Sequence, residues 1–174
     1  MEAIENVIDE WLITQFIGAM GSSSSYTTLK LKQVDTAILR NSKDWESWTF
    51  PALGISNRFV TRHPDGHIGP ENIPISKRIT YLLTFVTYGT ESTAIQTSRT
   101  LLARAEIALN TMRQGMGSIF NIYEEKVEKL TYYSTSEAPE AGSSRMRKYI
   151  DPNASGKWFV AQDISVVFVT TTGV

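Results

Sequence analysis

The chain has 174 residues, with 17 Lys and Arg against 18 Asp and Glu, and it contains no cysteine. This length suits a single domain, which typically holds about 100–200 residues. The missing cysteines exclude disulfides, Cys-ligated zinc, iron–sulfur clusters and thiol nucleophiles, and a formal net charge of −1 argues against the basic surface typical of nucleic-acid-binding proteins.

Residues 1–20 predict an amphipathic helix. Apolar residues recur on one side at helical spacing, namely Ile4, Val7, Ile8, Trp11 and Leu12, and acidic residues fill the other side. This helix either covers a sheet of its own subunit or docks on a neighbouring one. Its acidic start differs from that of a secretory signal, and no apolar run approaches the ~20 residues that span a bilayer. We therefore expect a soluble protein with no membrane partner.

Residues 26–60 predict the first strands of a sheet. Leu and Lys alternate over 29–32, as in a half-exposed strand. A segment that begins with Pro51 predicts an edge strand over 52–60, since proline is confined to strand starts, edges and bulges. Residues 61–76 hold three prolines and two glycines, and this composition predicts a long loop.

Residues 77–88 predict a central strand, because apolar side chains occupy both of its faces. A long helix is expected over 91–113, a strand or hairpin within 119–134, and a final strand over 158–172. The polar, Ser-rich stretch 134–157 predicts a second long loop. These elements together predict one α+β domain with a mixed, mostly antiparallel sheet. The N-terminal helix and the long central helix pack on it, and two long loops extend from it.

The chain offers few groups for catalysis. Its only histidines, His63 and His67, flank Asp65, and this spacing can hold a divalent metal or position a general base. The same residues surround Pro-Asp-Gly, a common turn sequence, and we favour the turn. No nucleophile elbow or phosphate-binding loop motif occurs. We therefore expect no catalytic residue, no cofactor and no bound metal.

One basic cluster lies in the second predicted loop, beside an aromatic residue. It either contacts nucleic-acid phosphates, forms a charged subunit interface or is plain solvated loop. Interface cores are enriched in Tyr, Trp, Arg and Met. The candidate interface residues, all in or beside segments expected to be irregular, are Trp48, Arg58, Tyr133, Arg145, Met146, Arg147, Lys148 and Tyr149.

The order of elements resembles that of the tail-terminator and tail-completion (neck) proteins of tailed bacteriophages. The parts that carry the resemblance are the helix Ile4 to Leu12, the segment Pro51-Ala52-Leu53-Gly54-Ile55 before a loop, the strand Ile79 to Tyr88 that runs through Gly89-Thr90-Glu91 into the helix Ile95 to Met112, and the final β run Asp163 to Thr170.

The resemblance implies a non-enzymatic virion protein that assembles in the host cytoplasm. It would form a homo-oligomeric ring, usually a hexamer, at the head-proximal end of the tail. Such a ring stops growth of the tail tube, contacts the tube and the head connector, and lets DNA pass without tight binding. The loops 61–76 and 134–157 are longer than the family pattern. A tail-tube or other head–tail connector subunit is therefore an alternative, and a small metal-dependent enzyme using His63, Asp65 and His67 is a third.

Overall fold

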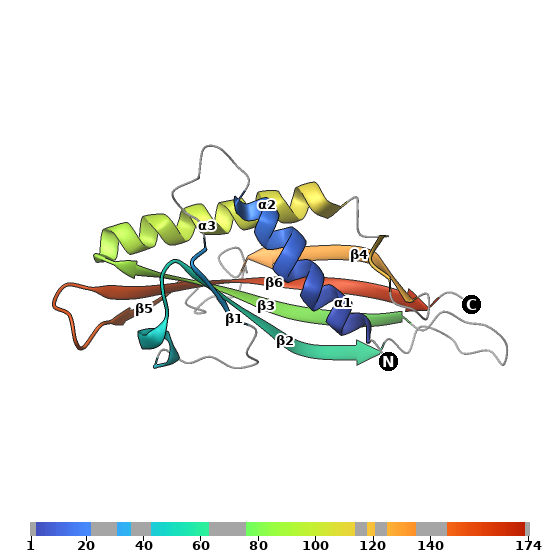
Figure 1. The fold of residues 1–174 in the computed structure, drawn as a ribbon, viewed down its shortest axis with the longest axis horizontal. Helices are drawn as coiled ribbons and strands as arrows, with labels where there is room; N and C mark the ends of the chain where they lie inside the picture. Colours follow the sequence, from blue (N-terminus) through green and yellow to red (C-terminus); the bar gives the residue numbers. More distant parts are fainter. Residues whose placement is uncertain are drawn as a thin grey trace, which may run out of the picture.

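The computed structural model describes residues 3–21, 31–35, 43–62, 76–113, 118–120, 125–134 and 146–172. They form a mixed, mostly antiparallel sheet with an N-terminal helix and a long central helix across it (Figure 1). The predicted α+β class is therefore confirmed. None of the described helices is long and apolar enough to cross a membrane.

The N-terminal helix consists of three successive segments. These are the α-helix α1 (Ile4–Trp11), the π-helical turn η1 (Leu12–Phe16) and the α-helix α2 (Ile17–Gly21). A short 3-10 turn, η3 (Asp44–Ser47), precedes the first long strand. The central helix α3 (Glu91–Met112) begins where the hydroxyl of Thr90 accepts a hydrogen bond of 3.4 Å from the amide of Thr93. This N-cap satisfies one of the free amides of the first turn.

The described residues form six strands of one sheet in the order β1-β2-β3-β6-β4, and β5 also pairs with β6. The strands are β1 (Gln33–Asp35), β2 (Ala52–Arg62), β3 (Ser76–Gly89), β4 (Glu125–Ser134), β5 (Met146–Ile150) and β6 (Trp158–Thr172). Among the strands that the structure describes, only β1 and β2 pair in parallel. β6 pairs with β3 along nearly its whole length, and β5 and then β4 occupy its other edge.

Two sequence-based predictions need correction. Residues 52–60 were expected to form an edge strand, but residues 52–54 pair with β1, which is the edge there; beyond residue 54, no described strand pairs with this side of β2. Residues 134–157 are not loop throughout, because β5 lies within them and pairs with the start of β6. A short polar strand is hard to recognise in sequence, since its backbone pairing rather than its apolar pattern holds it in place. Of the other predicted loop, 61–76, residues 63–75 lie outside the described parts of the chain.

The main core lies between the sheet and the two helices. Alternate side chains of β3 point into it, including Ile79, Tyr81, Leu83 and Phe85, and each of them is fully buried. The period of two residues places Val86 on the opposite face, where it is also buried. The prediction that both faces of this central strand are apolar and covered is confirmed at that position.

Candidate functional site

Five of the eight candidate interface residues lie at one end of the sheet. Trp48 follows η3, and Met146, Arg147, Lys148 and Tyr149 lie in β5, at the left of Figure 1. The pairing of β5 with residues 158–162 of β6 brings these parts of the chain together.

The other three candidates are not part of this group as far as the structure describes them. Arg58 lies in β2 at a bulge, and Tyr133 lies in β4 opposite Ser165, but only their backbone is described. Arg145 lies outside the described residues.

Arg147 is engaged inside its own subunit. Its Nη2 donates hydrogen bonds of 2.8 and 3.0 Å to the two carboxylate oxygens of Asp163, and the Thr84 hydroxyl donates to the same carboxylate at 2.8 Å. Its guanidinium carbon lies 5.8 Å from the ring centroid of Trp45. Arg147 therefore combines a carboxylate partner with an aromatic one, as this planar cation commonly does.

Lys148 belongs to a more exposed pair. Its Nζ lies 2.7 Å from Oε1 of Glu91 at the start of α3, and the two side chains are 41% and 44% exposed. Met146, two residues earlier in β5, is half-buried. The basic residues described in β5 thus project to both faces of the sheet, because successive side chains of a strand alternate.

A second apolar cluster covers the face of the sheet opposite the helices. We call it the aromatic cluster, and its aromatic members are Trp45, Trp48, Phe50, Tyr88, Tyr149 and Phe159. Phe50 stacks on Tyr88 with ring centroids 5.6 Å apart, and Tyr88 lies 4.9 Å from Phe159. Trp45 meets Tyr149 edge to face at 5.4 Å. These aromatic contacts hold η3, β3, β5 and β6 together.

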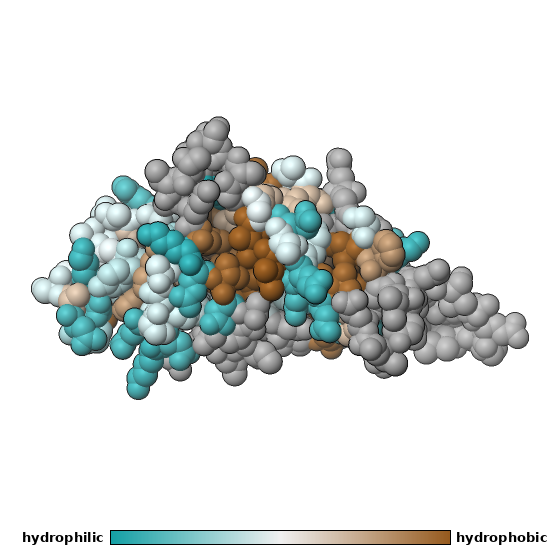
Figure 2. Space-filling view, in the orientation of Figure 1, coloured by the Kyte–Doolittle hydropathy of each residue, from teal (hydrophilic) through white to brown (hydrophobic). Residues whose placement is uncertain are grey.

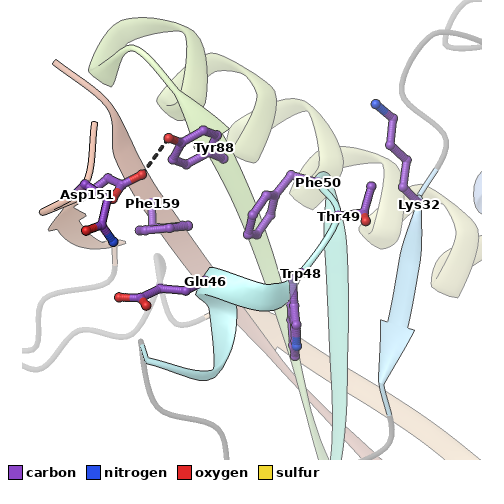
Figure 3. A pocket seen from close by; sticks show the side chains of 9 residues that line it. Lys32, Glu46, Trp48, Thr49, Phe50, Tyr88, Asp151 and Phe159 are labelled. Carbon is purple, nitrogen blue, oxygen red and sulfur yellow. Dashed lines mark hydrogen bonds between the residues drawn. The ribbon is translucent and has the colours of Figure 1, made fainter. Parts of the chain in front are cut away.

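The aromatic cluster forms one wall of a pocket of about 590 Å³, which we call the aromatic pocket (Figure 3). Its lining residues come from four parts of the chain and are Lys32, Glu46, Trp48, Thr49, Phe50, Tyr88, Asp151, Asn153 and Phe159. Of the sequence candidates whose side chains the structure describes, only Trp48 lines it. The aromatic residues gathered over 45–50, namely Trp45, Trp48 and Phe50, are a sequence signal that could have pointed to this region.

Tyr88 and Asp151 lie side by side in the pocket lining (Figure 3). The Tyr88 hydroxyl donates a hydrogen bond of 2.6 Å to Oδ2 of Asp151, and the backbone amide of Asn153 donates one of 2.8 Å to Oδ1. Both hydrogen bonds lower the pKa of Asp151, and the bond from Tyr88 contributes most. The bond between Tyr88 and Asp151 also raises the pKa of Tyr88. The carboxylate of Asp151 is therefore ionised and fixed in position at neutral pH.

The charged groups lie at two ends of the aromatic pocket. Figure 3 shows Glu46 and Asp151 at one end and Lys32 at the other, with Phe50 and Tyr88 between them. The Glu46 carboxylate makes no hydrogen bond or ion pair with the residues that the structure describes. One end of the pocket is therefore acidic, and part of that acidity is unpaired within the described chain.

A second hollow, about 780 Å³ in volume, lies between the N-terminal helix and the end of α3. We call it the helix groove. Its apolar lining residues are Val7, Trp11, Ile13, Met112 and Ile119. Ile13 lies in the π-helical turn η1 and is 41% exposed. Figure 2 shows apolar surface on both sides of the N-terminal helix.

The predicted histidine site cannot be placed, because His63, Asp65 and His67 lie outside the described residues. Within the described ranges, no three His, Cys, Asp or Glu side chains are close enough to one another to hold a metal ion.

No known protein-family model matches the chain, and no curated protein matches it with significance.

Proposed function

We propose that this chain is a structural subunit of a homo-oligomeric ring, a hexamer by its resemblance, at the head-proximal end of a phage tail. The ring terminates the tail tube and joins it to the head connector, and the role requires no catalysis. The confirmed α+β arrangement is compatible with the element order on which the resemblance rests. A subunit with a net charge of −1 suits a lumen through which DNA passes without tight binding.

The observation that carries the proposal is an apolar groove towards one end of the subunit and a single exposed apolar side chain at the other end. The first is the helix groove, whose Trp11 contacts Phe168 of β6 with ring centroids 5.9 Å apart. The second is Ile150, which is 63% exposed and pairs with Trp158 at the start of β6. Trp158 and Phe168 are ten residue steps apart along β6, which at ~3.3 Å per residue is roughly 33 Å.

Unlike surfaces at opposite ends favour a head-to-tail contact. A two-fold dimer uses the same patch on both copies, whereas a contact between two different patches repeats from copy to copy and closes into a ring when the rotation allows. In this proposal Ile150 of one subunit enters the helix groove of the next. Burial of such an apolar side chain favours association by about 1.5–3 kcal/mol.

The proposal is tested first by native mass spectrometry and electron microscopy of the purified chain, alone and with its tail-tube protein. A terminator gives discrete rings and caps tubes of limited length, and phage particles that lack it carry overlong or unjoined tails. A tail-tube subunit gives open-ended tubes instead. A strict monomer in both settings, together with normal tails in its absence, would exclude the ring.

Two variants test the head-to-tail contact. Ile13→Glu damages the helix groove, and Ile150→Asp removes the surface that enters it. Each variant alone should remain monomeric, while an equimolar mixture should form dimers, because one intact contact remains between unlike variants. Val60→Asp, at a residue that is 40% exposed and lines neither surface, is the matched control and should still form rings. If both single variants form rings, the contact between Ile150 and the helix groove is wrongly assigned, while the proposal of a ring is not contradicted.

A further inference from the structure

We propose that the aromatic pocket holds the side chain of an arginine presented by a partner protein chain. This inference goes beyond the ring contact, since neither Ile150 nor the helix groove contributes to the pocket. It rests on three observations, namely the acidic end of the pocket, its aromatic wall, and a bound arginine elsewhere in the same cluster.

The acidic end supplies the charge that a cation needs. Asp151 is held by Tyr88 and by the amide of Asn153, so its carboxylate does not have to reorganise when a ligand arrives. Glu46 stands nearby and its carboxylate makes no hydrogen bond or ion pair with a described residue. A carboxylate with free acceptor positions can take two parallel hydrogen bonds from a guanidinium.

The aromatic wall selects arginine over lysine. Phe50, Tyr88 and Phe159 lie within 5.6 Å of one another, measured between ring centroids, and all three line the pocket. A guanidinium is planar, weakly hydrated and able to stack on such rings while it donates in its own plane to a carboxylate. An ammonium group is compact and strongly hydrated, and gains less from this combination.

The chain already binds one of its own arginines in this way. Arg147 pairs with Asp163 and lies over Trp45, which belongs to the same aromatic cluster. The aromatic pocket repeats that combination of ring and carboxylate without an arginine of the described chain in its lining. The positive charge of Lys32, at the end of the pocket away from Glu46 and Asp151, repels any second cation that would lie there. The pocket therefore suits a single arginine rather than a run of basic residues.

The test is an NMR titration of the intact chain with N-acetyl-L-argininamide. Its neutral isostere, N-acetyl-L-citrullinamide, is the matched ligand control, because the two differ in charge and hardly in shape. We expect saturable shifts confined to Tyr88, Phe50, Phe159 and Glu46 with the arginine compound, and none with the citrulline compound. Equal shifts with both compounds, or none with either, overturn the proposal.

Variants locate the binding groups. Glu46→Gln should weaken binding of the arginine compound by at least about fivefold, as expected for loss of a charge-assisted pair. Glu10→Gln, at an exposed position of α1 outside the aromatic pocket, should leave the affinity for the arginine compound unchanged. Unchanged binding by Glu46→Gln overturns the assignment. The probe is a free amino-acid derivative, so its binding does not depend on ring assembly. A failure of the arginine compound to bind therefore does not contradict the ring proposal. A failure of the chain to form rings likewise does not contradict arginine binding.

Discussion

The Tyr88 hydroxyl donates a 2.6 Å hydrogen bond to Asp151, which lies 63 residues further along the chain. This contact ties the end of β3 to the turn between β5 and β6. The turn is closed in addition by a backbone hydrogen bond of 2.9 Å from the amide of Asp151 to the carbonyl of Lys157. The acidic end of the aromatic pocket is therefore built before any partner binds.

Replacing Tyr88 by Phe should raise the pKa of Asp151 towards its ordinary value of 3.8, because the largest cause of its lowering is removed. A lowered carboxyl pKa stabilises the fold above the unfolded pKa, and this contribution is lost as the pH falls through the folded pKa. The raised pKa of Tyr88 stabilises the fold below its ordinary value of 10.0, and this contribution is lost as the pH rises beyond it.

The stability difference between the wild type and Tyr88→Phe should therefore be constant between these two ordinary pKa values and shrink outside them. Urea unfolding over a pH series measures it, and the carboxyl carbon shift of Asp151 reports its titration directly. Tyr149→Phe is the control, since the Tyr149 hydroxyl makes no hydrogen bond with a described residue. A pKa of Asp151 that is the same in all three proteins would contradict the assigned cause.

Asp9→Asn should stabilise the protein at neutral pH. Burial is the main cause that raises the pKa of Asp9, and the nearby Glu5 adds to it, while the Tyr81 hydroxyl lowers it. A raised folded pKa means that the neutral form fits the fold better, so ionisation above this pKa costs stability. The urea midpoint should rise at pH 7 and stay unchanged at pH 3. Glu10→Gln, which is exposed, should show no such difference between the two pH values.

The two ion pairs of β5 should differ in their contributions to stability. Asp163→Asn weakens a contact in which Nη2 of Arg147 donates to both carboxylate oxygens and the side chains are 35% and 17% exposed, and it should cost about 1 kcal/mol. Lys148→Met removes a pair in which both side chains are more than 40% exposed, and it should cost less than about 0.5 kcal/mol. Urea unfolding of both variants compares them. Equal losses of unfolding free energy in the two variants would mean that the greater burial of the Arg147–Asp163 pair does not make it more stabilising.

Gly54 allows the indole of Trp48 to lie against β2. A Cβ atom at position 54 would stand 3.3 Å from Cη2 of Trp48, which is tighter than ordinary contact. Gly54→Ala should therefore destabilise the fold by about 1 kcal/mol. Trp48→Phe removes the opposing atom, so the cost of Gly54→Ala should fall in that background. Additive losses in a double-mutant cycle of urea unfolding would show that the two positions do not press on each other.

The order of the elements and the faces of the long strands are largely readable from sequence. The alternation of apolar residues over 77–88 and 158–172 is local, and it already assigns each side chain to one face of a strand. The start of α3 is equally local, because Gly89 and Thr90 end a strand and cap a helix. Residue type alone makes Arg147 and Tyr149 candidates, and the structure places Tyr149 in the aromatic cluster and Arg147 over its Trp45 ring.

Only the tertiary structure determined which strands are neighbours, and with this the aromatic pocket. An alternating pattern says nothing of the partner at each edge, so β1 at the edge of β2 and β5 on β6 were missed. The pocket joins Glu46, Tyr88, Asp151 and Phe159, which come from distant parts of the chain. Their proximity arises from long-range backbone pairing, whereas the side chains taken singly resemble an ordinary turn acid or an ordinary strand aromatic.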